Sequence, residues 1–127
     1  GEILADGCVS PQQGTDKNGP LGVFKSSMKI DQDPYQAVLL NMKFSPTALQ
    51  SESDLEKLAM AIRTYLASGA KHVQFNVVDA DTMRDAQKNP LEHRDLIVRV
   101  AGYSAYFNAL TPMIQGEIIN RTEYEHV

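Results

Sequence analysis

The sequence contains a single cysteine, Cys8, among its 127 residues. One cysteine excludes an internal disulfide and a cysteine-ligated metal cluster built by this chain alone. The three histidines are His72, His93 and His126, and they lack the close spacing typical of zinc ligands, so we expect no metal site. No apolar run approaches the roughly 20 residues that a membrane-spanning helix needs, and no secretory signal is visible. We therefore expect a cytoplasmic chain without membrane contact.

Size and charge narrow the possibilities further. A chain of 127 residues fits one domain. Its formal charge of −4 argues against a nucleic-acid partner. The sequence begins at Gly1 without an initiator methionine, which we interpret as a cleaved, tagged or truncated start.

The pattern of apolar residues and turn signals predicts an α/β fold. Residues 1–34 are rich in loop-forming residues, with a short helix expected at 21–30. The periodicity predicts three strands, at 38–44, 71–78 and 96–100. It predicts helices near 46, at 52–68, at 80–88 and at 111–122. The expected caps are Ser51 or Ser53 for the longest helix, Asp79 and Thr111 for the last two. The apolar stripe of the longest helix is Leu55, Leu58, Ala59, Ile62 and Leu66. Helices alternating with strands indicate the α/β class, and three strands make a small sheet with exposed edges.

One predicted strand carries amides on one face. Val73, Phe75 and Val77 alternate with His72, Gln74 and Asn76. If the amides are buried they need hydrogen-bond partners, since an unsatisfied buried polar group costs about 1–3 kcal/mol.

Four segments in order resemble a known enzyme family. They are Val9-Ser10-Pro11-Gln12-Gln13-Gly14-Thr15-Asp16-Lys17-Asn18-Gly19-Pro20, Gln74-Phe75-Asn76-Val77-Val78-Asp79, the stretch Arg94 to Phe107, and Gln115 to Thr122. Together they are similar to the C-terminal region of the glycyl radical enzymes. The Val-Ala-Gly-Tyr-Ser form at 100–104 resembles the dehydratase, lyase and decarboxylase branch more than the pyruvate formate-lyase branch.

The resemblance places the radical on Gly102. A backbone radical delocalises best at a planar carbon without a side chain, and glycine also permits unusual backbone angles. We expect the apolar residues on both sides, 96–100 and 103–107, to exclude water and oxygen. The alternative is a glycine at a strand end that serves only the backbone conformation.

The resemblance also implies the rest of the apparatus. The fold would be the C-terminal portion of a ten-stranded barrel, with residues 1–127 as one glycyl radical domain. Its parts would be a loop-rich segment at 1–34, the last strand and glycine loop at 96–107, and a C-terminal helix at 111–122. We expect that the chain itself binds no cofactor. An activase that uses S-adenosylmethionine and an iron–sulfur cluster installs the radical on Gly102, which passes it to a cysteine that attacks a small-molecule substrate.

Two features depart from the family pattern. Cys8 is not followed by the glutamate that the dehydratase branch carries two residues after its reactive cysteine, so we interpret Cys8 as a small loop residue, with a second redox role left open. The reactive cysteine is then expected on a larger partner chain or a missing region. Leu21-Gly22 replaces the usual Thr-Ala, so substrate identity does not transfer.

Other candidate sites are weaker. Ser10, His72 and Asp79 have the residue types of a hydrolase triad, but the sequence contains nothing that resembles a nucleophile elbow, so we do not expect a triad. The glycines Gly14, Gly19 and Gly22 lack dinucleotide-binding spacing. Asp79, Asp81 and Asp85 could suggest a cation site, but we interpret them as helix-capping and solvent-exposed residues.

Two functional hypotheses remain open. The chain is the radical-storing part of a lyase, with dehydration slightly favoured, that is inactive without the cysteine-bearing part. Alternatively, it is a spare part that restores the glycine loop of an oxygen-damaged enzyme. A third interpretation, an unrelated α/β binding domain, is weaker still.

Overall fold

The computed structural model describes residues 9–35 and 38–127. A parallel sheet lies at the middle of the molecule, in the order β2-β1-β5. Its strands are β1 (Leu40–Phe44), β2 (Val73–Val77) and the short β5 (Glu123–Tyr124). Leu40 pairs with Val73 and Phe44 with Val77, so β1 and β2 run in register over their full length. This parallel sheet confirms the predicted α/β class.

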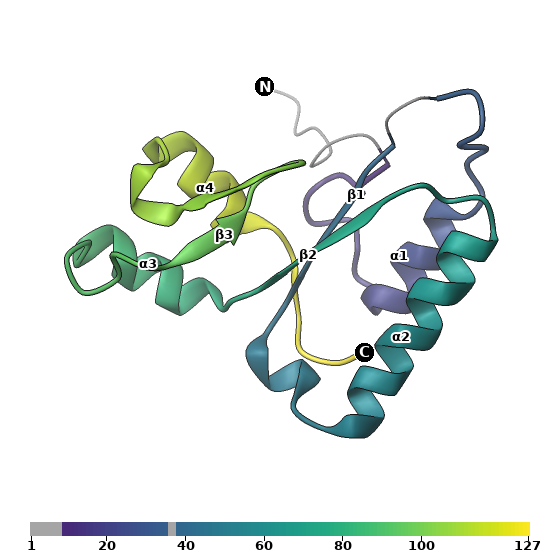
Figure 1. Cartoon of the computed structure of the whole chain (residues 1–127), viewed down its shortest axis with the longest axis horizontal. Coiled ribbons are helices and arrows are strands. Elements are labelled where there is room, and N and C mark those ends of the chain that lie inside the picture. The colour runs from purple at the N-terminus through teal and green to yellow at the C-terminus, as the bar shows by residue number, and fades with distance from the viewer. Residues whose placement is uncertain (1–8, 36–37) are drawn as a thin grey trace.

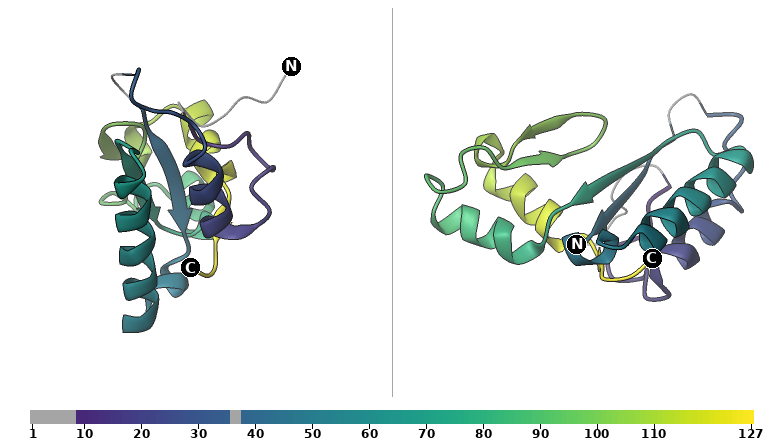
Figure 2. Two further views of the ribbon diagram at one scale, coloured as in Figure 1. Left: turned by 90° about the vertical axis from the view of Figure 1, so that its right-hand side faces the viewer. Right: turned by 60° about the horizontal axis from the view of Figure 1, so that its bottom comes forward.

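Two groups of elements lie on either side of this sheet (Figures 1 and 2). On one side are α1 (Gly19–Ser27) and α2 (Glu52–Ala67), with the 3-10 turn η1 (Pro46–Leu49) leading into α2. On the other side are α3 (Ala80–Lys88), α4 (Pro112–Asn120) and a β-hairpin. The hairpin consists of β3 (Ile97–Arg99) and β4 (Ser104–Tyr106), followed by the 3-10 turn η2 (Phe107–Ala109).

The helix starts follow the chemistry of their caps. The Ser51 hydroxyl accepts the Asp54 N–H at 3.1 Å, and the Asp79 carboxylate accepts the Thr82 N–H at 2.6 Å. Thr111 accepts the Ile114 N–H at 3.4 Å. Each bond satisfies a donor that the first helical turn leaves free, so the three predicted caps are confirmed.

The two sides of the sheet differ in polarity. Leu40, Met42 and Phe44 of β1 pack with α1 and α2 in one apolar cluster. The alternate residues of the two long strands are polar and buried: Asn41, Lys43, Gln74 and Asn76. Gln74 and Asn76 contact the hairpin, Lys43 contacts the end of α4, and Asn41 accepts a hydrogen bond from Gln74. A second apolar cluster joins α3, α4 and the hairpin through Met83, Ala86, Val98, Val100, Phe107, Ile118 and Ile119.

Two predictions about the elements need correction. The chain forms the short strands β4 and β5 in addition to the three that were predicted, so residues 97–99 are not the last strand. Both are too short, at three and two residues, to show an alternating pattern in the sequence.

The buried face of α2 also differs from the predicted stripe. Leu55 and Leu66 are 52% and 44% exposed, whereas Ala61 and Tyr65 are buried. The Tyr65 ring packs 5.1 Å from that of Phe24, and its hydroxyl accepts a hydrogen bond from Gln32. The Tyr65 ring gains apolar contacts and a hydrogen bond when it is buried, so α2 presents the face with Tyr65 to the core. The spacing of the leucines alone does not predict this orientation.

In the part of the chain that the structure describes, no helix has the length and apolar character required to cross a membrane.

Candidate functional site

Gly102 lies in the tight turn that connects β3 to β4. The Val100 N–H donates to the Tyr103 carbonyl at 2.9 Å and closes the turn around Ala101 and Gly102. Gly102 has φ +76°, a left-handed conformation that is strained for residues with a side chain. Among the described residues other than its two chain neighbours, no atom lies within 4 Å of a Cβ built at this position, so the turn restricts the residue through its backbone angle and not through crowding.

The turn is exposed in this chain. Ala101, Gly102 and Tyr103 are all exposed, and Ile97 and Tyr106, which pair across the hairpin, are 57% and 55% exposed. The expectation that flanking apolar residues shield Gly102 is therefore wrong for this chain. Val98 and Val100 are buried, but they face the second apolar cluster and not the turn.

Side chains of β2 form hydrogen bonds that connect the hairpin to the parallel sheet. Asn76 donates to the Arg99 carbonyl at 2.7 Å and accepts the Arg99 N–H at 2.6 Å, as a neighbouring strand would. Gln74 accepts the Gly102 N–H at 3.0 Å through its Oε1. The two amides predicted on this strand are thus buried and have partners in the glycine hairpin, whereas His72, predicted on the same face, is exposed.

The end of α4 supports the same hairpin. The Arg121 guanidinium donates to the Val100 carbonyl at 2.9 Å and to the Arg99 carbonyl at 3.3 Å. Glu117 lies 3.6 Å from Arg121, one helical turn earlier in the chain, and both hairpin contacts of Arg121 are shorter than this one.

Lys43 lies beneath this arrangement, with its side chain fully buried. Its Nζ donates to the Ile119 carbonyl at 2.8 Å, at the C-terminus of α4, and lies 3.8 Å from the Glu123 carboxylate. Burial lowers the pKa of Lys43, while the nearby Glu123 raises it. Asn41, Lys43 and Arg121 were not predicted as parts of the site. A polar residue at alternate positions of an otherwise apolar strand was the available signal for the first two.

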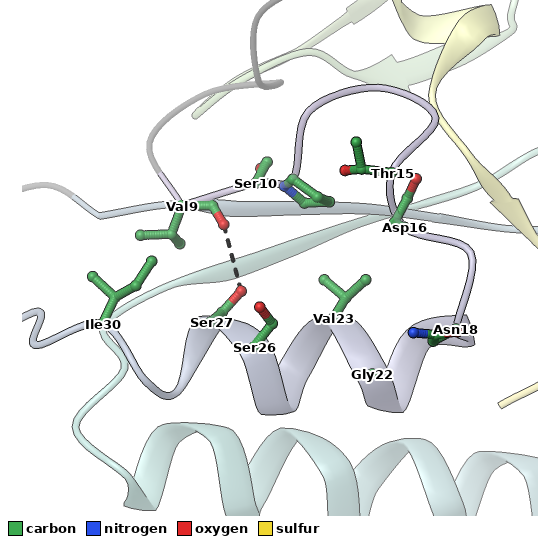
Figure 3. Close-up of a pocket in the computed structure, with 12 residues that line it drawn as sticks. Val9, Ser10, Thr15, Asp16, Asn18, Gly22, Val23, Ser26, Ser27 and Ile30 are labelled. Atoms are coloured by element: carbon green, nitrogen blue, oxygen red, sulfur yellow. Dashed lines mark hydrogen bonds between the residues drawn. The ribbon is translucent and has the colours of Figure 1, made fainter.

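The segment before α1 forms a separate cavity of about 330 Å³ (Figure 3). Ser10, Thr15, Asp16 and Asn18 from the loop and Ser26 from α1 are among its lining residues. Asp16 connects this loop to the C-terminal segment: its carboxylate accepts hydrogen bonds from the hydroxyls of Thr122 and Tyr124 at 2.6 and 2.7 Å. Cys8 lies outside the described residues.

The structure does not assemble the weaker candidates. His72 precedes β2 and Asp79 follows it, so the whole length of the strand separates them. Ser10 accepts the Asn41 N–H instead. Asp81 pairs with Arg84 at 2.9 Å and Asp85 with His93 at 2.7 Å. Among the described residues, no three potential ligands gather around a metal position.

Comparison with known proteins shows similarity over nearly the whole chain. A family model described as "Glycine radical" matches residues 5–108. Indoleacetate decarboxylase of Tractidigestivibacter scatoligenes is 48% identical over 98% of this chain, which corresponds to 14% of that protein. Trans-4-hydroxy-L-proline dehydratase of Clostridioides difficile is 47% identical over 91% of this chain and 15% of its own length.

A solved structure gives the same result. The glycerol-bound, B12-independent glycerol dehydratase of Clostridium butyricum superposes with a TM-score of 0.88 at 46% identity. The match covers 92% of this chain and 15% of that one. The chain therefore spans about one seventh of the length of the relatives that it matches.

Proposed function

The chain belongs to the glycyl radical enzyme family, as its C-terminal glycyl radical domain, and on that premise we propose that Gly102 stores the radical. The observation that carries the proposal is the turn itself. Gly102 occupies a left-handed position at the tip of the hairpin, with open space at its Cα and its N–H held by a side chain of the sheet. An exposed turn of this kind can be presented to another protein and then enclosed by it.

The chemistry explains why this residue is a glycine. Loss of a hydrogen atom from Cα leaves an unpaired electron between an amide nitrogen and a carbonyl, and both groups share it when the carbon is planar. A side chain would crowd that planar carbon, and in this turn it would also strain the closed-shell backbone. Both requirements select glycine at position 102.

We propose a two-step transfer. An activase that carries S-adenosylmethionine and an iron–sulfur cluster would supply a carbon radical that takes one hydrogen atom from the Gly102 Cα and keeps it in a new C–H bond. The Gly102 radical then takes the hydrogen atom from a cysteine thiol: the S–H bond breaks, the Cα–H bond reforms, and the sulfur keeps the unpaired electron. The thiyl takes a hydrogen atom from the substrate, and the product radical takes that atom back at the end of turnover. The thiyl then takes the hydrogen atom of the Gly102 Cα, which restores the stored radical.

The cysteine belongs to another polypeptide or to a region outside this sequence. Cys8 is the only cysteine here, and its neighbours do not match the family's reactive cysteine. The relatives are about seven times longer than the matched region, which leaves ample chain for a cysteine loop. We therefore propose that a larger, cysteine-bearing part completes the site and supplies the shielding that Gly102 lacks here.

The reaction class we propose is a lyase reaction on a small molecule. Relatives of nearly equal identity include a decarboxylase at 48% and a dehydratase at 47%. An isethionate sulfite-lyase of Bilophila wadsworthia is 43% identical. These values do not separate the bond types, and dehydration remains a slight preference within this set.

Electron paramagnetic resonance tests the proposal. The chain is mixed with its cysteine-bearing partner and an activase without oxygen, and the spectrum is recorded. We expect a doublet that is absent in Gly102→Ala. Brief exposure to air should then cleave the chain at Gly102 and release a peptide that begins near Tyr103. The proposal is wrong if a competent activase produces no organic radical and the chain stays intact after exposure to air.

Co-purification distinguishes a subunit from a spare part, the second candidate. A subunit should be recovered with a large chain that lacks its own glycine loop. A spare part should be recovered with a large chain whose glycine loop has been cleaved.

A further inference from the structure

We propose that Gln74 is a positioning residue for the Gly102 radical: its side-chain oxygen holds the peptide group next to the radical carbon in one orientation. The inference rests on the function proposed above and adds a residue to it. Gln74 lies on β2, 28 positions before Gly102, and is only 6% exposed.

The contacts of Gln74 determine which way its amide points. Its Oε1 accepts from the Gly102 N–H and from the Arg99 Nε, each at 3.0 Å. Its Nε2 donates to the Asn41 side-chain oxygen and, at 3.4 Å, to the Val100 carbonyl. Two donors face the oxygen and two acceptors face the nitrogen, so a rotated amide would lose all four bonds.

The strands behind Gln74 reinforce this orientation. Asn41, 8% exposed, accepts from Gln74, while its own N–H donates to the Ser10 hydroxyl at 3.0 Å. Ser10 is also buried. A continuous set of hydrogen bonds thus leads from the N-terminal loop through β1 and β2 to Gly102, and buried polar groups of this kind are costly to leave unpaired.

One amide therefore contacts both sides of the glycine turn. Gln74 binds the carbonyl of Val100, where the turn begins, and the N–H of Gly102 at its tip. The nitrogen of that N–H is one of the two groups over which the unpaired electron spreads. Sharing requires the peptide plane to stay aligned with the radical orbital, and an acceptor on the N–H also increases electron donation from the nitrogen. The hydrogen bond to Gln74 serves both requirements.

Asn76 provides a matched control. It lies on the same strand and the same face, carries the same functional group, and holds the same hairpin through two short bonds to Arg99. Both of these bonds are made to the backbone of Arg99 and neither to Gly102. If Gln74 serves only to attach the hairpin, Gln74→Met and Asn76→Leu should have similar effects on the radical.

The experiment compares wild type, Gln74→Met and Asn76→Leu, each with ¹⁵N at glycine. In the isolated chain, amide exchange at Gly102 should accelerate about tenfold in Gln74→Met, the usual effect of losing one hydrogen bond. In the activated complex, Gln74→Met should store at least about threefold less radical, with a smaller ¹⁵N hyperfine coupling. Asn76→Leu should keep the wild-type coupling.

The outcomes separate the two proposals. If the wild-type complex gives no doublet, both the proposed function and this inference are wrong. A doublet with the same yield and the same ¹⁵N coupling in wild type and Gln74→Met overturns the inference alone, as does an equal loss in both variants. If Gln74→Met fails to fold, Gln74→Asn replaces it, because that variant keeps the amide but withdraws it from Gly102 by one methylene.

Discussion

At the residue scale, Gly102 combines a backbone conformation with a chemical role, and the two are separable by substitution. The left-handed φ of +76° selects glycine even if no radical ever forms. The open space around its Cα means that an added methyl group meets no other part of the chain. A folded variant without radical chemistry should therefore be obtainable.

We expect Gly102→Ala to fold and to lose about 1 kcal/mol of unfolding free energy, because alanine is strained in this conformation. Gly116→Ala is the matched control. Gly116 lies within α4, has no positive φ and leaves open space for an added methyl group, so alanine there should stabilise the chain by about 0.5–1 kcal/mol. Urea unfolding followed by circular dichroism measures both. Equal effects of the two substitutions would contradict the strained turn.

Lys43 is the second residue whose environment leads to a prediction. Its ammonium is bound to the last carbonyls of α4, so Lys43→Met should destabilise the chain by about 1–3 kcal/mol at pH 7. Burial lowers the pKa of Lys43 below its ordinary 10.5, so the unfolded chain binds the extra proton. Wild-type stability then rises, through this group, as pH increases from the lowered pKa toward 10.5.

The difference between wild type and Lys43→Met should therefore widen in alkaline solution. Comparing the pair removes the opposing contribution of Tyr65 and Tyr124, whose pKa values burial raises. Lys57→Met is the control, since Lys57 is 59% exposed and forms only a surface pair with Asp54. A constant gap between pH 7 and 10 would show that burial of Lys43 does not shift its pKa.

At the scale of elements, α3 begins directly after β2 and shares the second apolar cluster with the hairpin. Its first turn depends on Asp79, whose pKa is lowered chiefly by the hydrogen bond from the Thr82 N–H. The sequence predicted this cap, and the structure adds that a side chain of β5 supports it: Glu123 accepts the Ala80 N–H at 2.8 Å.

We expect Asp79→Ala to cost about 1 kcal/mol at pH 7 through loss of the cap. Because the folded-state pKa is lowered, this contribution is present above the ordinary pKa of 3.8 and disappears as pH falls through the folded-state value. The penalty should shrink in acid, as thermal unfolding at pH 7 and pH 3 will measure. Asp81→Ala, with a side chain 94% exposed, should change stability by less than about 0.5 kcal/mol at both pH values.

At the scale of the whole molecule, two groups of elements lie on opposite sides of one parallel sheet (Figure 2), and each group contains its own apolar cluster. Polar side chains of β2 hydrogen-bond to the hairpin on one side of the sheet. Phe24 lies in the α1–α2 cluster, and Phe107 in the cluster beneath the hairpin. Because the hairpin pairs with β2 through side chains and not through a backbone ladder, it should open more readily than the sheet.

We expect Phe107→Leu to accelerate amide exchange of Val98 and Ala105 while leaving α2 unaffected, and Phe24→Leu to have the reverse effect. Each substitution removes buried ring surface from one cluster only, at a cost of about 1–2 kcal/mol. Native-state hydrogen exchange read residue by residue makes the comparison. If both variants accelerate every amide equally, the molecule opens as one unit and the two clusters are not separable.

Local features of this fold were predictable because their causes are local. Caps at Ser51, Asp79 and Thr111 depend on bonds that span three residues, and the sequence shows both partners. The glycine motif and the amide row on residues 72–76 were visible for the same reason. The inward face of α2 was not, because Tyr65 is buried by Phe24 and Gln32, which lie far away in the sequence.

By itself, the sequence determined the α/β class, the helix starts, the family and the identity of the candidate radical residue. Only the tertiary structure decided what holds that residue: the side chain of Gln74, which lies 28 positions earlier in the sequence, and the Arg121 guanidinium. It also decided that the turn is exposed within this chain. The physical reason is that a periodic pattern shows that a strand has a polar face, but not what packs against it. That depends on how β1 and β2 align in register and on where α4 ends, and both follow from packing across the whole chain.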